Sequence, residues 1–364
     1  MVRILHLLDR DAEFEAERGA ESIGRAVGEG FGVTRRTIGH GGDWRDPATA
    51  AAMLRRSTET FDVIHAWGGR ALTVAALGGT GKSPIVFSPA SDTRLRTTQW
   101  LRAVMSYRRV EVVCPTSTVH RKLVERGVPL ERCHLIRPGV EFSRVKRRRD
   151  PALREQLGLS EHDHVLLAVG ESTRAAAHRD AAWAASILHV ADPKYKMLVW
   201  GRGPSVTSVA HFGRNVMPDA LRIAQRRLGP RVEFEELLPA ADTIVVTARA
   251  SVATLPIAIA MAAALPIVAT VTPTVAELLE DRHTALMTAP GKPRLFAQRV
   301  LDLIGDSSAQ WTLADMARTE AYEYFSFTRF VNQVRSVYRQ AVDSDRVEVQ
   351  QPAPGAGMRF HGRT

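Results

Sequence analysis

A chain of 364 residues, 45% of them hydrophobic, is long and apolar enough to build two domains with cores of their own. The net charge of +10 lies almost entirely in the first half: residues 1–150 hold 26 Lys and Arg against 17 Asp and Glu, and residues 151–364 hold 23 against 22. The two cysteines, Cys114 and Cys133, exclude a disulfide framework and favour a reducing cytoplasm.

The apolar segments are too short or too interrupted for a signal peptide or a membrane span. Residues 4–8 run directly into charged residues, which is not the pattern of a signal peptide. The longest apolar stretch, residues 252–271, is broken by Pro256 and Pro266 and is better interpreted as a helix followed by a strand. We therefore expect a cytoplasmic protein that is soluble or peripheral at the inner membrane face.

The basic first half has a plain and a functional interpretation. Most basic faces are simply solvated, and otherwise they attract anionic partners such as phospholipid head groups, phosphorylated acceptors or nucleic acid. The interpretation as a nucleic-acid-binding protein would rest on charge alone, because the chain has no motif that combines aromatic with basic residues. We expect no nucleic-acid partner.

Strands and helices are predicted to alternate through the first 140 residues. Short apolar runs favour strands, and the amphipathic segments between them favour helices, one of which is expected to open at Gly19. This alternation predicts parallel βαβ units. The expected strands are residues 2–8, 32–38, 84–88 and 110–116, with a further strand, glycine turn and helix inside residues 61–79.

The second half repeats the alternation after a basic linker at residues 144–151. The uncharged run 243–248 suits a strand that is covered on both faces, and Pro266 ends the helix that follows it. The expected strands are 164–170, 231–234, 243–248 and 267–269, and the expected helices include 181–190, 219–229 and 255–265. In parallel sheets ligands bind beyond the carboxyl ends of the strands, so loops 248–254 and 270–274 are the candidate site.

The expected organisation has four parts. Residues 1–145 form the first domain and residues 146–326 the second. The amphipathic helix 327–343 is expected to pack back on the first domain, and residues 344–364 are expected to be a disordered tail.

Several motifs are distributed over the whole of this pattern: IRPGV at 136–140, GRGP at 201–204, AADTIVV at 240–246, IAMAAALPIVAT at 259–270, Glu277, and EYFSFTRF before the final helix. In these motifs the chain resembles the group 1 glycosyltransferases of the GT-B fold, a retaining family that uses nucleotide sugars. The resemblance covers about residues 1–341. It implies two doubly wound, Rossmann-type α/β domains that face each other across a cleft.

The resemblance also implies a set of site residues. Gly170, Arg174 and Arg179 are expected at the donor diphosphate, Gly201 and Gly203 at the nucleotide, Thr272 and Glu277 at the donor, and Gly19 and His65 across the cleft, with His65 as the catalytic residue. Two alternatives stay open. His65 would otherwise be a hydrogen-bonded structural histidine, and Arg18, which replaces a family glycine, would contact a phosphate, narrow the cleft or be solvated.

The sequence departs from the family pattern at polar positions. Two glutamates that the family spaces eight residues apart fall on Ser251 and Ile259, a histidine near the reacting sugar falls on Ala90, and an arginine falls on Glu171. Arg174, His178 and Arg179 could supply cations from shifted positions, because phosphate binding needs positive charge and N–H donors within reach.

Two functions from different classes follow. The leading hypothesis is transfer of a sugar, with retention, from a nucleotide-diphosphate sugar to an unknown acceptor that is lipid-linked or anionic. The alternative is a catalytically inactive binding or scaffold protein of the same shape. No cofactor and no metal site are expected, since the D-x-D pairs (Asp9 with Asp11, Asp343 with Asp345) lie after a strand and in the tail. Val206, where a dinucleotide fingerprint needs glycine, disfavours a dehydrogenase.

Overall fold

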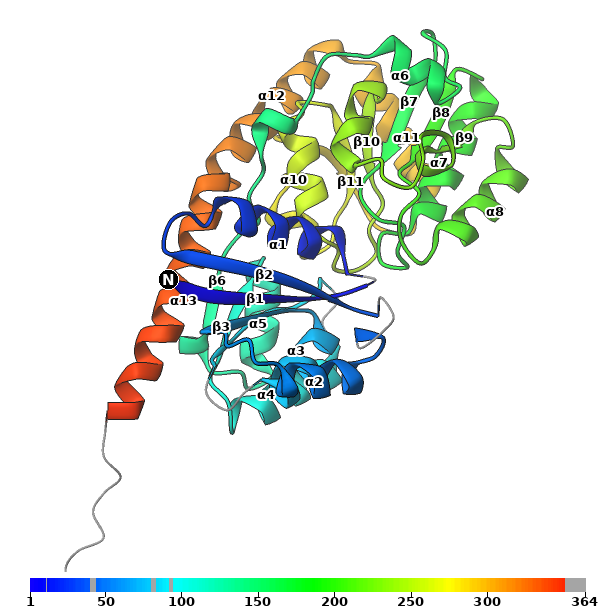
Figure 1. Cartoon of the computed structure of the whole chain (residues 1–364). Helices are drawn as coiled ribbons and strands as arrows, with labels where there is room; N and C mark the ends of the chain where they lie inside the picture. The colour runs from blue at the N-terminus through cyan, green and yellow to red at the C-terminus, as the bar shows by residue number, and fades with distance from the viewer. Residues whose placement is uncertain (11, 40–43, 80–82, 92–93, 351–364) are drawn as a thin grey trace, which may run out of the picture.

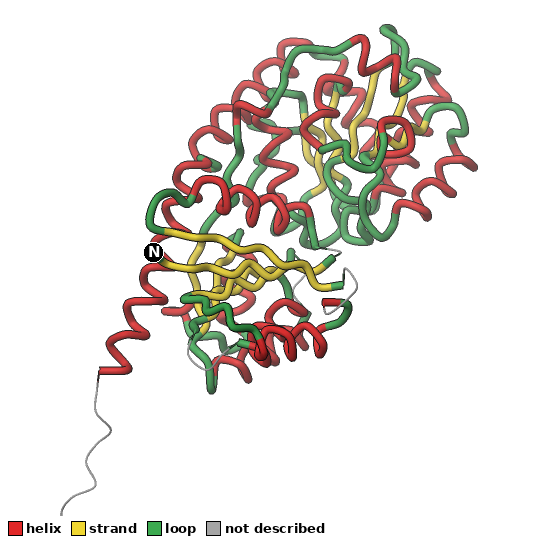
Figure 2. The backbone as a smooth tube through the Cα atoms, in the orientation of Figure 1, coloured by secondary structure: helices red, strands yellow, loops and turns green. Residues whose placement is uncertain are grey.

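The computed structural model describes residues 1–10, 12–39, 44–79, 83–91 and 94–350. It contains two parallel sheets, each with helices packed around it, and the two α/β units lie one against the other (Figures 1 and 2). The expected architecture of two doubly wound, Rossmann-type domains is therefore confirmed. Among the described residues, none of the helices has the length and apolar character that a membrane crossing needs.

The first sheet has the strand order β2-β1-β3-β4-β5-β6, and all of its pairs are parallel. The order reverses between β1 and β3, so the loops after these two strands diverge and leave room for a ligand between them. The strands are β1 (Val2–Asp9), β2 (Phe31–Ile38), β3 (Val63–Trp67), β4 (Ile85–Ser88), β5 (Val110–Cys114) and β6 (Cys133–Leu135). The helices are α1 (Phe14–Ala26), α2 (Pro47–Arg56), α3 (Gly69–Gly78), α4 (Leu95–Met105) and α5 (Ser117–Glu125).

The second sheet has the order β12-β11-β10-β7-β8-β9, which reverses between β10 and β7. Its strands are β7 (His164–Ala168), β8 (Tyr195–Val199), β9 (Leu221–Ile223), β10 (Thr243–Val246), β11 (Ile267–Thr270) and β12 (Leu286–Thr288). Its helices are α6 (Pro151–Gln156), α7 (His178–Ala191), α8 (Val206–Val216), α9 (Ala224–Leu228), α10 (Leu255–Ala262), α11 (Pro293–Ile304) and α12 (Ser307–Tyr324).

The edge of this sheet corrects one prediction. The expected helix 219–229 is split into the short strand β9 and helix α9, and the expected strand 231–234 does not form. A capping box explains the difference: the backbone N–H of Glu233 donates to Glu236, so a 3₁₀-helix, Phe234–Ala240, begins where a strand was expected. Leu221 to Ile223 then pair with β8 instead.

Helix α10 is the centre of the second domain. All eight of its residues are buried, and α12 packs along it. A helix that is apolar on every side can be stable only inside a core. Ile259, which stands where the family has a glutamate, is 2% exposed and belongs to the same apolar cluster. Its apolar side chain therefore suits this position in the core.

The last helix, α13 (Phe327–Gln350), leaves the second domain and packs on the first (Figure 1). It runs seven residues further than the expected helix, so residues 344–350 are helical rather than part of a disordered tail. Residues 351–364 lie outside the described residues. The buried residues recur with a helical period and contact β3, β4, β5 and α1: Phe330, Val331, Val334, Val337, Tyr338 and Ala341.

The packing of α13 gives a first prediction. Val334 is fully buried and Gln333, its neighbour in the helix, is exposed. Val334→Ala should lower the free energy of unfolding by at least about 1.5 kcal/mol, at roughly 0.8 kcal/mol for each buried carbon removed. Gln333→Ala, which removes an exposed side chain from the same turn of the helix, should change it by less than about 0.5 kcal/mol. Equal effects of the two changes in denaturant unfolding would contradict this packing.

Candidate functional site

Helix α1 lies between the first sheet and the second domain (Figure 1). Alternate residues at the start of α1 are acidic: Glu13, which precedes the helix as its N-cap residue, and then Glu15 and Glu17. Glu15 and Glu17 make polar contacts to the second domain. The site is therefore assembled by contacts between segments that are about two hundred residues apart in the sequence.

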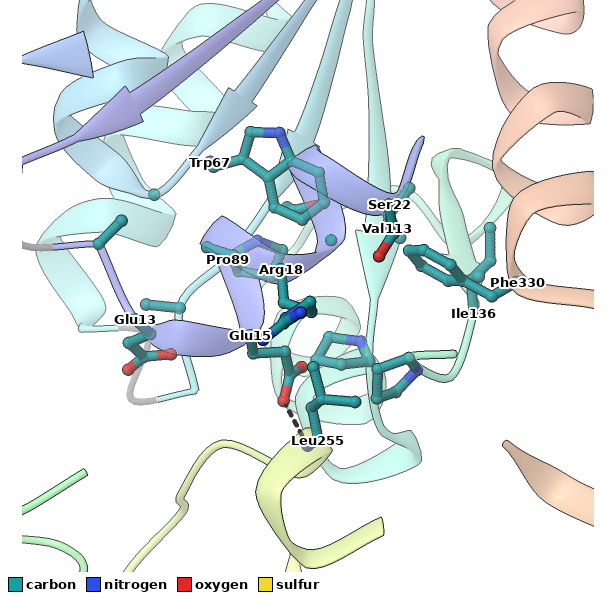
Figure 3. Close-up of a pocket in the computed structure, with 18 of the residues that line it drawn as sticks. Glu13, Glu15, Arg18, Ser22, Trp67, Pro89, Val113, Ile136, Leu255 and Phe330 are labelled. Atoms are coloured by element: carbon teal, nitrogen blue, oxygen red, sulfur yellow. Dashed lines mark hydrogen bonds between the residues drawn. The ribbon is translucent and has the colours of Figure 1, made fainter. Parts of the chain in front are cut away.

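Glu15 caps a helix of the opposite domain. Its carboxylate accepts the backbone N–H of Thr254 at 2.6 Å and of Leu255 at 2.9 Å, and the Thr254 hydroxyl at 3.1 Å (Figure 3). These amides form the N-terminus of α10, where the helix dipole favours an anion. Burial raises the pKa of Glu15 to about 7, although the hydrogen bonds from Leu255 and Thr254 act against this rise.

Glu277 makes the reciprocal contact. From the second domain, it accepts the backbone N–H of Ser117 at 2.7 Å and of Thr118 at 2.6 Å. These two residues begin α5 of the first domain. The expected donor contact of Glu277 is therefore replaced, in this arrangement, by a cap on a helix across the interface.

Arg202 joins the domains through a third set of contacts. Its guanidinium donates to Glu171 at 2.7 Å within the second domain, and to Glu17 and the Ala12 carbonyl of the first domain, both at 2.8 Å. Glu171 also accepts the backbone N–H of Phe14 at 3.1 Å. Glu171, which stands where the family has an arginine, is thus the counter-charge of Arg202.

Arg18 is buried rather than solvated. Its guanidinium lies 3.0 Å from both Glu233 and Glu235 of the second domain. Among the alternatives for Arg18, the structure therefore favours the one in which this side chain narrows the space between the domains.

Two of the cavities among the described residues adjoin the candidate site at the interface. The larger, here called the apolar cavity, has a volume of about 250 Å³ and lies at the carboxyl end of the first sheet, with Gly19 in its wall. The smaller, the interdomain cavity, has a volume of about 30 Å³ and lies at the reversal point of the second sheet, where Gly170, Glu171 and Glu13 line it.

His65 does not reach either cavity. It is fully buried in β3, stacks on Trp67, and its two ring nitrogens lie 2.6 Å from the Tyr338 hydroxyl and 2.9 Å from the Ser88 hydroxyl. Burial, with the neighbouring His6, holds its pKa well below the ordinary value. This geometry corrects the expected catalytic role: His65 is a hydrogen-bonded histidine that fixes α13 on the first sheet.

The expected glycines occupy close backbone approaches. Gly19 lies in the middle of α1, not at its start, and a Cβ there would lie 2.7 Å from the Trp67 ring. Gly203 has φ +109°, and a Cβ would lie 2.6 Å from the Ser172 carbonyl. Gly201 has φ +100° and faces Ile223, and Gly170 has φ +71° beside Pro256 at the start of α10. Gly170, Gly201 and Gly203 are therefore required by the backbone conformation, and Gly19 by the Trp67 ring beside it.

The remaining expected residues are not brought together. Arg174 is exposed in the loop before α7, and Arg179 is exposed on α7 with its guanidinium over the Phe212 ring, 4.8 Å from the centroid. Thr272 is buried and accepts the backbone N–H of Val275, as a cap within its own loop. The residues predicted from the sequence did not include Arg202 and Glu15. The three glutamates at alternate positions at the start of an amphipathic helix were a signal that could have indicated Glu15.

The pKa of Glu15 gives a second prediction. A carboxyl whose pKa is raised by folding stabilises the folded state at low pH and loses this effect as the pH rises through 7. Between about pH 6 and pH 8, the folded protein should therefore lose roughly 1 kcal/mol through this group. Glu15→Gln, which keeps an oxygen acceptor, should remove that part of the loss in unfolding free energy.

The matched control is Glu21→Gln, on the exposed face of the same helix, where the partner is Arg25 at 3.7 Å. Its pH dependence should equal that of the unmodified protein. A Glu15→Gln protein that loses as much stability as the unmodified one over this range would contradict the assignment.

Comparison with known families covers both domains. Residues 2–144 match the family described as Glycosyltransferase Family 4, and residues 163–306 match Glycosyl transferases group 1. N-acetyl-alpha-D-glucosaminyl L-malate synthase of Bacillus anthracis is 23% identical over 196 residues, which are 53% of this chain and 50% of that protein. The match thus spans half the length of that curated relative.

Solved structures with the same fold extend the match to nearly the whole chain. Anabaena HepE in complex with UDP and glucose superposes with a TM-score of 0.76 at 18% identity, over 93% of this chain and 100% of HepE. Sucrose-phosphate synthase from Thermosynechococcus elongatus gives 0.73 at 16% identity, over 94% and 100%. With its two family matches and this fold, the chain belongs to the group 1 glycosyltransferases of the GT-B fold.

Proposed function

We propose that this chain transfers a sugar from a nucleotide-diphosphate sugar to an acceptor hydroxyl, with retention at the anomeric carbon. In this reaction the bond between the anomeric carbon and the diphosphate oxygen breaks, and a bond to the acceptor oxygen forms. The acceptor proton goes to the departing diphosphate or to solvent. Membership of the family supports the donor class, and the resemblance to retaining members supports the stereochemistry.

One observation carries the proposal. The N-terminal amides of α10 already donate to a carboxyl oxygen, that of Glu15, at the reversal point of the second sheet. Helix N-termini at such points bind phosphate groups well. A diphosphate would take the place of this carboxylate and receive the same N–H groups.

The cations of the proposed donor site come from the same edge. Arg202 holds Glu17 and Ala12 of the first domain, and separation of the domains would release both contacts and leave its N–H groups for a phosphate. Arg174 lies in the loop that follows Gly170 and is proposed as a second cation. Arg179, which lies over Phe212, is not part of this proposal.

Donor binding requires the domains to separate. The interdomain cavity holds about 30 Å³, whereas sites for ligands of drug size occupy about 300–1,000 Å³. The contacts of Glu15, Glu277, Arg18 and Arg202 would then break, and the chain would bend at residues 138–145 and 325–326, which pair through Val140 and Phe325. Closure over the bound donor would exclude water from the reaction.

A non-catalytic protein of the same fold is the second candidate. Ile259 is enclosed in apolar core and offers no polar contact, and Ser251 replaces the other family glutamate. The donor would then be held by α10 amides and arginines without the carboxylates that orient the sugar. The binding experiment below separates this candidate from the enzyme only together with a transfer assay.

Several expectations enter as parts of this proposal. They are that no metal or cofactor takes part, that the protein is cytoplasmic, and that its first domain contacts a membrane surface. Support for the last comes from the excess of 26 Lys and Arg over 17 Asp and Glu in residues 1–150.

The third prediction tests the donor site by calorimetry with uridine, guanosine and adenosine diphosphates and their nucleosides. At least one diphosphate should bind, and at about 100 times its dissociation constant it should add roughly 2.7 kcal/mol to the unfolding free energy. Arg174→Ala should weaken this diphosphate by about tenfold or more, the scale of a charged hydrogen bond, and should leave the nucleoside unchanged.

Arg179→Ala is the matched control and should not change the affinity. Binding without transfer from any of the corresponding UDP-, GDP- or ADP-sugars would favour the non-catalytic candidate. The absence of binding by every diphosphate would overturn the donor proposal.

A further inference from the structure

The apolar cavity faces the α10 N-terminus but belongs mainly to the first domain. Its wall consists mainly of residues at the ends of the first-sheet strands, in the loops that follow them and on one face of α1, and Leu255 of α10 and Phe330 of α13 complete it. Figure 3 shows Glu15 pointing to Leu255 below the cavity, with Trp67 above and Phe330 at the side. A molecule in this cavity would therefore lie next to the proposed donor phosphate.

Most of the wall is hydrocarbon. The apolar side chains come from separate strands and helices and surround the space: Trp67, Pro89, Val113, Ile136, Leu255 and Phe330. Two aromatic rings and several aliphatic groups favour the burial of an apolar body by the area it removes from water.

Many polar groups in the wall already have protein partners, whereas the indole N–H of Trp67 and one guanidinium nitrogen of Arg18, both buried, have none among the described residues. Ser88 bonds His65 at 2.9 Å, Ser22 donates to Glu141 at 3.1 Å, and Glu13 accepts the Ser91 amide and hydroxyl at 3.0 and 2.8 Å. Arg18 is held by two glutamates. A sugar has a hydroxyl on nearly every carbon, and each hydroxyl buried without a partner costs about 1–3 kcal/mol.

The charge of the wall also discriminates. Asp9, Glu13 and Glu15 contribute carboxylates, whereas the guanidinium of Arg18 is matched by Glu233 and Glu235. The wall thus repels an anion and leaves carboxylate oxygens that can accept from a hydroxyl. This speaks against the anionic acceptor expected from the basic first half.

The volume of the apolar cavity limits the size of a molecule that it can hold. A cavity of about 150 Å³ lined by aliphatic and aromatic groups holds a benzene molecule, so about 250 Å³ holds a body of one or two rings.

We propose that the acceptor is a neutral molecule with an apolar body of one or two rings and a hydroxyl group at the end that faces Glu15. The proposal rests on the proposed transferase function, because only that function makes the occupant an acceptor. The hydroxyl oxygen would bond to the anomeric carbon as the diphosphate leaves, and its proton would go to the diphosphate or to solvent.

The test uses naphthol as the neutral probe, with hydroxynaphthoate as the same ring carrying a carboxylate and methyl glucoside as the polar probe. Binding is measured by calorimetry without any nucleotide. Naphthol should bind saturably, and the other two should bind at least tenfold more weakly.

Two variants locate the binding. Ala90→Phe fills the cavity and should weaken naphthol at least tenfold, whereas Ala103→Phe, the same change on the exposed face of α4, should leave it unchanged. If Ala90→Phe does not fold, Val113→Thr keeps the volume, places a hydroxyl in the wall and should weaken naphthol about threefold or more.

Failure of naphthol to bind, equal binding of hydroxynaphthoate, or insensitivity to the cavity variants would overturn the acceptor proposal. Nucleotide binding is measured independently. If no nucleotide binds but naphthol does, the transferase function is contradicted and the apolar site is not. If a nucleotide binds but naphthol does not, only the inference on the acceptor is contradicted.

Discussion

Two glutamates, one from each domain, hold the interface together, because each one caps a helix that begins in the opposite domain. Glu15 receives the amides of α10 and Glu277 those of α5, and Arg202 adds a charged link beside them. Such caps satisfy N–H groups that a helix leaves without partners and place negative charge at the positive end of its dipole. The same amides are what an anionic ligand would use, so closure of the protein and binding of a phosphate compete for one set of donors.

The fold could be predicted from the sequence because both domains repeat one local pattern. Runs such as residues 243–246 have no charge, which fits a strand buried on both faces, and the all-apolar α10 can lie only inside a core. The edge of the second sheet was predicted less well. Leu221 to Ile223 form a strand through pairing with β8, whereas Arg231 to Phe234 look more strand-like but are taken by the capping box of Glu233 and Glu236.

At three of the predicted site residues, the backbone alone explains why glycine is present. Gly170, Gly201 and Gly203 lie at positive φ and in close approaches, and their contact with a donor stays a prediction. Side-chain roles depend on partners far along the chain, and spacing cannot show these. His65 was expected at the end of a strand, as a site residue would be, but it lies in the middle of β3, and the hydroxyl that holds it belongs to Tyr338, more than 270 residues later. Glu15 meets Thr254 by a contact of the same kind.

The hydrogen bond between His65 and Tyr338 also bears on how this protein is made. A ribosome releases the first domain first, but the apolar face of β3, β4 and β5 receives its cover from α13, the last helix described. The second domain has all of its helices once α12 ends at Tyr324. The core of the first domain is therefore complete only after the last helix of the second domain has been made. Until α13 has left the ribosome, the apolar face that it covers lacks this cover.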